Sequence, residues 1–231
     1  MHLFYTPDIQ LKQLPDEEAG HCVRVLRLKE GDSIALTDGK GVFYRAAITS
    51  ATSKKCTYEI VETHPMERLW KPSIAVAVAP TKNMERMEWL VEKMTELGVD
   101  DIIPILCAHS ERKILKPERL VKIAVSAMKQ SVKPFLPHIH SMIPFSELMK
   151  TPFDGQKFIA HCYKDQKLDL KKAYTPFNNV LILIGPEGDF SEEEVDRALK
   201  QGYTPVSLGN SRLRTETAAL AACHTIHVLS D

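Results

Sequence analysis

Two segments near the C-terminal end of this chain share one layout: a short apolar strand, a break at glycine, and then the start of a helix. They are LILIGPEGDFS at residues 181–191 and LGNSRLRTETAA at residues 208–219. Open α/β sheets bind their ligands beyond the carboxyl ends of the strands. We therefore expect the two glycine loops to follow neighbouring strands of a mainly parallel sheet and to form one ligand crevice.

The alternation of strands and helices from Ser73 onward supports such a sheet. Apolar runs predict strands at 73–79, 101–106, 136–142, 157–162, 180–184 and 205–208. Helical periodicity predicts helices at 83–98, 117–130, 191–201 and 215–229. Gly98 is placed to end the first of these helices, and Ser191 with Glu194 forms a capping box at the start of the third.

Residues 1–62 are instead rich in β-branched and aromatic side chains. Strands are expected at 33–37, 42–50 and 56–61, with a hairpin turn at 38–41 and a short helix after Pro15. The segment is too short for a large sandwich, so it predicts a small barrel. Two prolines and a lack of periodicity predict a linker over 63–72, which divides the chain into domains of residues 1–68 and 73–231.

Composition bounds the class of protein. A chain of 231 residues with 44% apolar residues forms one large domain or two modest ones with a real core. No apolar run approaches the roughly 18 residues of a membrane helix, and the N-terminus lacks a signal-peptide layout. Five scattered cysteines, an odd number, favour reduced thiols in a cytoplasmic protein, without a disulfide framework or a metal site.

The distribution of charge is more informative than the net charge, which is zero. Residues 111–133 hold seven Lys or Arg against two Glu. A basic helix of this kind is either an ordinary solvated face or the positive stripe of an RNA-binding protein.

The first loop contains Gly185-Pro186-Glu187-Gly188. Gly185 permits a sharp turn, and Gly188 permits a ligand to approach main-chain amides closely. The loop is neither a dinucleotide fingerprint nor a P-loop. Because Glu187 stands where a phosphate would need a cation, a phosphate ligand is disfavoured. The alternative is a plain turn that contains two glycines.

The second loop carries Arg212 and Arg214 immediately before a helix, with Thr215 as the expected N-cap. Positive charge is unfavourable at a helix start. Arg214 is therefore better suited to hold a polyanion or to stabilise a developing negative charge. The alternative is a salt bridge from Arg214 to Glu187 or Glu216.

The two loops resemble those of the ribosomal RNA small-subunit methyltransferase E family, which are 16S rRNA (uracil-N3)-methyltransferases of the SPOUT superfamily. Lys82, the stretch from Met87 to Val99, Pro104 and the N-terminal stretch from His21 to Asp32 also fit this family, so the resemblance covers nearly the whole chain. It implies an N-terminal PUA-like β-barrel that grips RNA and a C-terminal α/β domain threaded as a trefoil knot. It also implies a homodimer that acts on 16S rRNA or the small ribosomal subunit, with no membrane attachment.

The resemblance assigns roles to residues of this chain. S-adenosylmethionine would be held by three loops and the residues beneath them: Ala160, His161, Leu183, Ile184, Gly185, Pro186, Glu187, Gly188, Leu208, Gly209, Asn210, Leu213, Thr217 and Ala218. Uracil N3 becomes a nucleophile only when it loses its proton, and a guanidinium stabilises the resulting anion. Arg214 is therefore the expected catalytic group, with Glu187 or Glu216 as the candidate base.

RNA contacts are expected from basic side chains of the barrel and of the basic helix: His2, Arg24, Arg27, Lys29, Lys129 and Lys133. The chain departs from the family pattern at five positions. Leu3 lies where many members have an arginine near the aromatic pair, and Val132-Lys133 replaces Gly-Arg. Asp189 replaces a glycine after GPEG, and Ser211 replaces an arginine in the second loop.

Two other functions compete with methyl transfer. A nucleotide-binding transferase would need a phosphate loop, which the sequence lacks. A non-catalytic RNA-binding module would not need Arg214 and the loop glycines, which the sequence retains.

Overall fold

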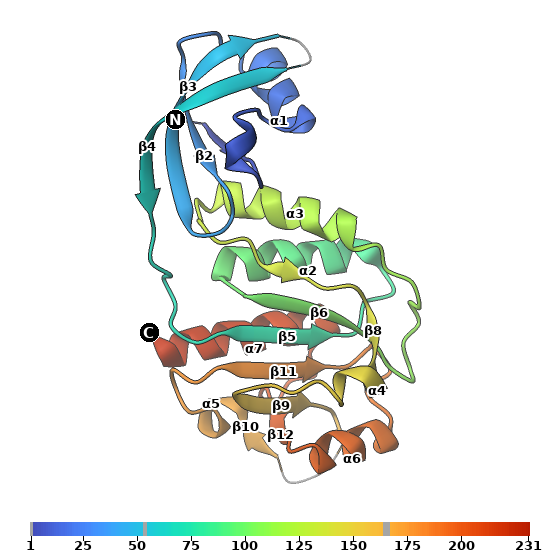
Figure 1. The fold of residues 1–231 in the computed structure, drawn as a ribbon. Helices are drawn as coiled ribbons and strands as arrows, with labels where there is room; N and C mark the ends of the chain where they lie inside the picture. Colours follow the sequence, from blue (N-terminus) through green and yellow to red (C-terminus); the bar gives the residue numbers. More distant parts are fainter. Residues whose placement is uncertain (1, 53–54, 164–166) are drawn as a thin grey trace. The chain divides into compact units, whose positions relative to one another are not determined.

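The computed structural model describes residues 2–52, 55–163 and 167–231. The chain forms two compact units (Figure 1). Unit 1 comprises Met1–Leu69 together with Val125–Leu136, and unit 2 comprises Trp70–Ala124 together with Pro137–Asp231. The sequence did not predict that a segment from the middle of the chain belongs to the first unit.

Unit 1 is built on a four-stranded sheet in the order β1-β2-β3-β4. Its strands are β1 (Leu3–Tyr5), β2 (Ser33–Thr37), β3 (Val42–Ala51) and β4 (Cys56–Pro65). The β1–β2 pair is parallel and the other two pairs are antiparallel. Its core contains Phe4, Ile34, Leu36, Ile48 and Tyr58. Because β4 runs to Pro65, the first residues of the expected linker are strand.

A helical segment between β1 and β2 covers this core. A short 3-10 helix, η1 (Ile9–Leu11), precedes α1 (Asp16–Gly20), and α1 continues directly into a π-helix, η2 (His21–Val25). The expected helix after Pro15 is therefore present, but its second half has the wider π geometry. Cys22, on the π-helix, is fully buried in the core of unit 1.

The segment Val125–Leu136 contributes the end of α3 (Pro117–Gln130) to unit 1. The helix ends in a Schellman motif, because the amide of Val132 donates to the Lys129 carbonyl at 3.3 Å and that of Lys133 to the Met128 carbonyl at 3.0 Å. Val132 takes the left-handed position of this motif with φ 51°. Glycine is the usual residue there, so a β-branched valine is strained.

Unit 2 contains an eight-stranded sheet whose main path runs β10-β12-β9-β11-β5-β6-β7, with β8 beside β6. Every pair in it is parallel, as the sequence predicts. The strands are β5 (Ile74–Val78), β6 (Asp101–Leu106), β7 (His138–Ile139), β8 (Ile143–Pro144), β9 (Gln156–Ala160), β10 (Leu168–Asp169), β11 (Val180–Ile184) and β12 (Thr204–Ser207).

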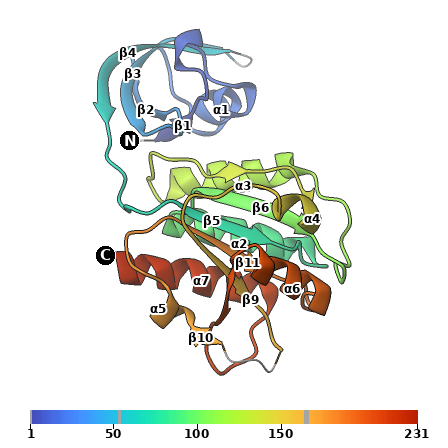
Figure 2. The same cartoon turned by 60° about the horizontal axis from the view of Figure 1, so that its bottom comes forward.

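Helices cover both faces of this sheet. On one face, α4 (Phe145–Leu148) and α6 (Glu192–Lys200) pack against alternate residues of the central strands, including Ala75, Leu181 and Leu183. On the other face, α7 (Thr215–Ser230) runs along β5 and β11 and packs against α2 (Met84–Leu97), while α5 (Leu170–Ala173) contacts α7 (Figure 2). None of the helices in the described ranges is both long and apolar enough to cross a membrane.

Local sequence signals account for several helix ends. The Asn83 side chain accepts from the Glu85 amide at the start of α2, and Gly98 ends that helix in the left-handed conformation. Ser191 and Glu194 form the expected capping box at the start of α6. The expected strand at 136–142 is wrong in length: two short strands, β7 and β8, lie beside the two ends of β6.

Candidate functional site

Two adjacent cavities open at the carboxyl ends of β9, β11 and β12, with volumes of about 520 and about 500 Å³. Residues that line both cavities form their common wall: Ala160, Cys162, Ile184, Arg212, Leu213 and Ala218. The expected crevice is therefore present as two hollows. The two glycine loops do not follow neighbouring strands, however, because β9 lies between β11 and β12.

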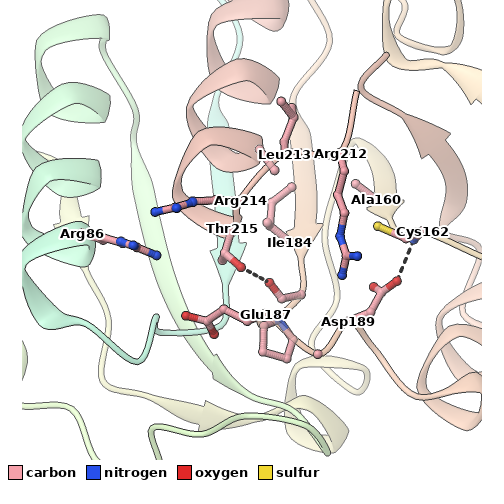
Figure 3. Close-up of a pocket in the computed structure, with 14 residues that line it drawn as sticks. Arg86, Ala160, Cys162, Ile184, Glu187, Asp189, Arg212, Leu213, Arg214 and Thr215 are labelled. Atoms are coloured by element: carbon pink, nitrogen blue, oxygen red, sulfur yellow. Dashed lines mark hydrogen bonds between the residues drawn. The ribbon is translucent and has the colours of Figure 1, made fainter. Parts of the chain in front are cut away.

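The lining of the first cavity includes three arginines and two carboxylates: Arg86, Arg212, Arg214, Glu187 and Asp189. Figure 3 shows Arg86 reaching from α2 and Arg214 from the start of α7 toward the same space, with Glu187 nearby. Within the described parts of the chain, the guanidinium of Arg214 has no hydrogen bond or ion pair to protein. The guanidinium of Arg214 is thus presented to the cavity without a direct bond to the carboxylates that also line it.

The two carboxylates named as alternative salt-bridge partners of Arg214 have other partners. Glu216 is nearly buried, and its Oε1 lies 3.8 Å from Nε of Arg86. Glu187 is exposed in the cavity, and its Oε1 accepts from the amide of Lys82 at 3.0 Å. The alternative interpretation of Arg214, a salt bridge to either residue, is therefore not supported by the described contacts.

Arg112 holds the segment that anchors Glu187. Its Nε donates to the Thr81 carbonyl at 3.0 Å, and its second guanidinium nitrogen donates to the Lys82 carbonyl at 2.6 Å. Because the Lys82 amide holds Glu187, this arginine indirectly fixes the carboxylate at the cavity wall. Its place in the sequence, far from both glycine loops, gave no sign of this role.

The glycines of the first loop act by packing. Neither Gly185 nor Gly188 has a positive φ. A Cβ at Gly185 would lie 3.1 Å from the Phe190 ring, and one at Gly188 would lie 3.0 Å from Cβ of His109. The expectation that Gly185 serves a sharp turn is therefore wrong, because the loop needs both glycines for close contact with neighbouring side chains.

Asp189, which stands in place of a glycine, is the left-handed residue of this loop, with φ 65°. Its carboxylate offsets that strain by accepting two main-chain hydrogen bonds, from Cys162 at 2.7 Å and from Phe190 at 2.9 Å. The loop after β11 is thereby joined to the segment after β9. Asp189, which departs from the family pattern, therefore helps to position the wall of the cavity.

Thr215 joins the first loop to the second. Its hydroxyl donates to the Gly185 carbonyl at 3.0 Å in a buried position. The N-cap of α7 is Arg214, which makes no side-chain capping bond, so the expected cap at Thr215 is wrong by one residue. Thr215 instead holds the GPEG loop against the start of the helix.

Cys162 is an exposed thiol at the common wall of the cavities. Partial burial raises the pKa of this thiol, and the carboxylate of Asp189 raises it further, against smaller opposing effects of Arg212 and Lys167. The thiol is therefore protonated at neutral pH and is a weak nucleophile.

The second cavity is lined by the loop after β12, including Leu208, Gly209 and Asn210. Gly209 has φ 119°, and a Cβ built on it meets no atom within 4 Å. On the other side, the Lys167 ammonium donates to the carbonyls of His161 at 2.6 Å and Tyr163 at 2.5 Å. Small residues, apolar side chains and the two cations Lys167 and Arg212 therefore line this hollow together.

All of the expected cofactor residues except Leu183 and Thr217 line one or both cavities. Leu183 is fully buried on the sheet face that carries α6, and Thr217 is exposed on α7. Arg214 and Glu187 line the first cavity, whereas Glu216 does not. Sequence reasoning did not place seven of the lining residues in this site: Arg86, Cys162, Lys167, Asp189, Val206, Ser207 and Thr215.

The expected RNA-binding residues all belong to unit 1. His2, Arg24, Arg27 and Lys29 are exposed. Lys129 is paired with the largely buried Glu18 at 2.5 Å, and burial lowers the pKa of Lys133. Four of the six side chains are thus accessible to a polyanion, whereas Lys129 on α3 and Lys133 just beyond its end are less so.

The chain matches the family model of an RNA methyltransferase domain over residues 69–227 and that of an RNA methyltransferase PUA domain over residues 14–61. It is 30% identical over 223 residues to ribosomal RNA small subunit methyltransferase E of Bacillus subtilis, which covers 91% of this chain and 87% of that protein.

Two solved structures are similar over the full length of the chain. A probable rRNA-methyltransferase from Porphyromonas gingivalis has a TM-score of 0.94 at 47% identity, covering 100% of this chain and 98% of that one. Ribosomal RNA small subunit methyltransferase E from Neisseria gonorrhoeae, bound to S-adenosyl methionine, has a TM-score of 0.85 at 30% identity, with the same coverage. The expected fold class, a parallel-sheet α/β domain with a small PUA-like N-terminal domain, is confirmed, and the trefoil knot stays a prediction.

Proposed function

Because this chain belongs to the family of ribosomal RNA small subunit methyltransferase E, we propose that it transfers a methyl group from S-adenosylmethionine to N3 of one uracil in 16S rRNA. The observation that carries the proposal is the unpaired guanidinium of Arg214 at the mouth of a two-part cavity. The expected substrate is 16S rRNA, free or within the small ribosomal subunit, in the cytoplasm.

The second cavity suits a cofactor that carries no phosphate. Small and apolar residues line it together with Lys167 and Arg212, and the Lys167 ammonium is already bound to the carbonyls of His161 and Tyr163. A Cβ built on Gly209 meets no atom within 4 Å, so a ligand can approach the main chain there closely. We propose that the residues that line the two cavities among the expected cofactor set hold S-adenosylmethionine, and that Glu187 and Asp189 favour its positive sulfonium. When bound, the cofactor supplies an electrophilic methyl group.

The first cavity suits the uracil. Its N3 becomes nucleophilic when the proton is lost, and the negative charge spreads to the flanking carbonyl oxygens. Arg214 would stabilise that anion, because a preorganised cation lowers the free energy of a charge as it develops. Arg86 adds a second cation, and its pairing with Glu216 fixes the direction in which it points.

Glu187 is the better candidate for the base. It is exposed in the first cavity, and the hydrogen bond from Lys82 occupies Oε1 and leaves Oε2 for a proton. Glu216 lies outside the cavity lining and is paired with Arg86. We therefore propose that Glu187 accepts the N3 proton and that Glu216 positions Arg86.

Cys162 invites one competing reaction, in which a thiolate adds to the uracil ring and directs the methyl group to carbon. The raised pKa of this thiol disfavours that route. Cys162→Ser is expected to retain methylation of N3 within a few-fold, whereas on the covalent route the variant would lose methyl transfer altogether.

Arg214→Ala tests the proposal. We expect methylation to fall about 100-fold or more, the scale seen when one transition-state donor is removed, while calorimetry shows little change in affinity for S-adenosylmethionine. Arg197→Ala, an exposed arginine on α6, is the matched control and leaves both unchanged. Near-normal methylation by Arg214→Ala would refute the role, and no heat with S-adenosylmethionine would refute the cofactor.

The target base is tested by reverse transcription across 16S rRNA from a strain that lacks the protein. Methylation of N3 blocks the Watson–Crick edge and stops the polymerase. The stop should disappear in the deletion strain and return with the wild-type gene but not with Arg214→Ala. A stop that persists in the deletion strain excludes this protein as its source.

RNA binding and oligomeric state are further parts of the proposal. We propose that Arg24, Arg27 and Lys29 contact phosphates, so that replacing them by Ala weakens RNA binding for all sequences and lowers its salt dependence. We also propose a homodimer, which light scattering on the full chain tests directly.

A further inference from the structure

Three side chains of metal-ligating type meet at the amino ends of β6 and β7 in the unit 2 sheet. Asp101 is the first residue of β6 and His138 is the first residue of β7, and the two are direct partners in the parallel register. His140 follows two positions later, so it shares a face with His138 because side chains alternate along a strand. The amide of His140 still donates to the Ile102 carbonyl at 3.0 Å, which holds this alternation beyond the end of β7.

The distances bring three potential ligand atoms together. Nε2 of His140 lies 2.6 Å and Nδ1 of His138 lies 3.6 Å from the same oxygen of Asp101. The two imidazole rings have centroids 4.0 Å apart. One ligand atom from each residue lies within 4.8 Å of those from the other two. A small change in side-chain torsion brings them to the roughly 2.0–2.2 Å that each needs from a shared ion.

We propose that Asp101, His138 and His140 bind a divalent transition-metal ion of the zinc class. Imidazole and carboxylate together suit Zn²⁺, Co²⁺ and Ni²⁺, and three protein ligands on one face leave the remaining positions to water. On binding, the ion takes the place of the hydrogen-bonded proton between Nε2 of His140 and Asp101, and that proton passes to solvent. His138 is mostly exposed, so an ion has direct access to the site from solvent.

This site is separate from the methyltransferase cavities. It lies at the amino ends of β6 and β7, whereas the cavities lie at the carboxyl ends of β9, β11 and β12. All strands of the sheet are parallel, so the proposed metal site and the cavities lie at opposite ends of the strands. The proposed metal is therefore structural: it fastens the two-residue edge strand β7 to β6.

The test uses the full-length chain without an affinity tag, treated with chelator and then titrated with Co²⁺ or Zn²⁺. The wild-type protein should bind one ion, and His138→Gln should weaken binding at least tenfold. His64→Gln is the matched control, because His64 lies 3.2 Å from Glu62 as an exposed histidine–carboxylate pair in unit 1. That variant should bind the ion like the wild type. Equal binding by the wild type and His138→Gln, or no binding by the wild type, overturns the proposal.

Two further readouts separate this site from the exposed thiol of Cys162 and from misfolding. The Co²⁺ spectrum should show ligand-field bands without a thiolate charge-transfer band, and such a band would overturn the proposal. Zn²⁺ should raise the melting temperature of the wild type by mass action but not that of His138→Gln. Without metal, His138→Gln should keep the wild-type melting temperature, because His138 is exposed. Asp101→Asn should bind the metal as weakly as His138→Gln does.

Discussion

The hydroxyl of Thr215 donates to the carbonyl oxygen of Gly185 at 3.0 Å, and this single buried hydrogen bond joins the two glycine loops that the sequence brings to one site. One loop follows β11 and the other precedes α7. Their relative position sets the shape of the first cavity, so the bond contributes to the site as well as to the fold.

Thr215→Val should therefore lower both the stability of the fold and the affinity of the site for S-adenosylmethionine. The buried Gly185 carbonyl loses its partner, which costs about 1–3 kcal/mol of unfolding free energy, and affinity for S-adenosylmethionine should fall. Urea unfolding and calorimetry measure the two effects. Thr225→Val is the control, because the Thr225 hydroxyl donates to Ala221 at 2.8 Å within the same helix and joins no loops. Unchanged cofactor affinity in Thr215→Val would show that the loops hold their position without this bond.

Val132→Gly should stabilise the protein. Val132 is exposed and has φ 51° in the Schellman motif that ends α3, where a β-branched residue is strained. The free energy gained by relief of strain exceeds the free energy lost because glycine gives the unfolded chain more conformational entropy. The free energy of unfolding should therefore rise by about 0.5–1 kcal/mol. Val228→Gly, at an equally exposed position inside α7, should instead lose about 0.5 kcal/mol. A loss of stability in both variants would contradict the assignment of strain to Val132.

Asp189→Gly should destabilise the protein although Asp189 has a similar φ of 65°. Glycine relieves the strain but removes the carboxylate that accepts from Cys162 and Phe190. Hydrogen bonds to a charged group are worth about 1.5–3 kcal/mol each, more than the strain. Cofactor affinity and unfolding free energy should fall in the order wild type, Asp189→Asn, Asp189→Gly. Wild-type affinity in Asp189→Gly would mean that the loop is fixed by packing alone.

The Cys162 thiol should react slowly at neutral pH. Burial and Asp189 raise its pKa, so at any given pH below that value less of it is thiolate than of an ordinary cysteine. Alkylation followed by mass spectrometry should be several-fold slower at pH 8 than for free cysteine, and its rate should continue to rise above pH 9. A rate that reaches its plateau below pH 8 would show the opposite shift. The other four cysteines are buried and serve as internal references.

Local signals in the sequence predict much of the fold. Asn83, Gly98 and the Ser191–Glu194 capping box mark helix ends because they act through hydrogen bonds a few residues away. The place of Val125–Leu136 in unit 1 depends on long-range contacts, such as the close approach of Phe135 to Gly41, and the helical periodicity of that segment carries no trace of them.

The residues of the candidate site likewise fall into those that local sequence predicts and those that depend on long-range packing. The glycine loops and Arg214 are adjacent in sequence to the strands and helix that position them, so they were predictable. Arg86 enters the cavity from α2, which packs beside α7. The misplacement of Thr217 has a simpler cause: each step along a helix turns the side chain by about 100°, so Thr215 faces the GPEG loop while Thr217 faces solvent.

The position of β11 between β9 and β5 has a consequence for synthesis on the ribosome. β5 pairs on one side with β11, and Ile74 and Val180 are register partners. Beside them, the amide of Ser73 donates to Oδ1 of Asn179, 106 residues away. During translation, the all-apolar strand β5 therefore has one edge without its partner until β11 has been synthesised and has left the ribosome. Pairing over such a separation is slow, and unpaired strand edges promote aggregation. We expect nascent unit 2 to depend on chaperones until its last third has been translated.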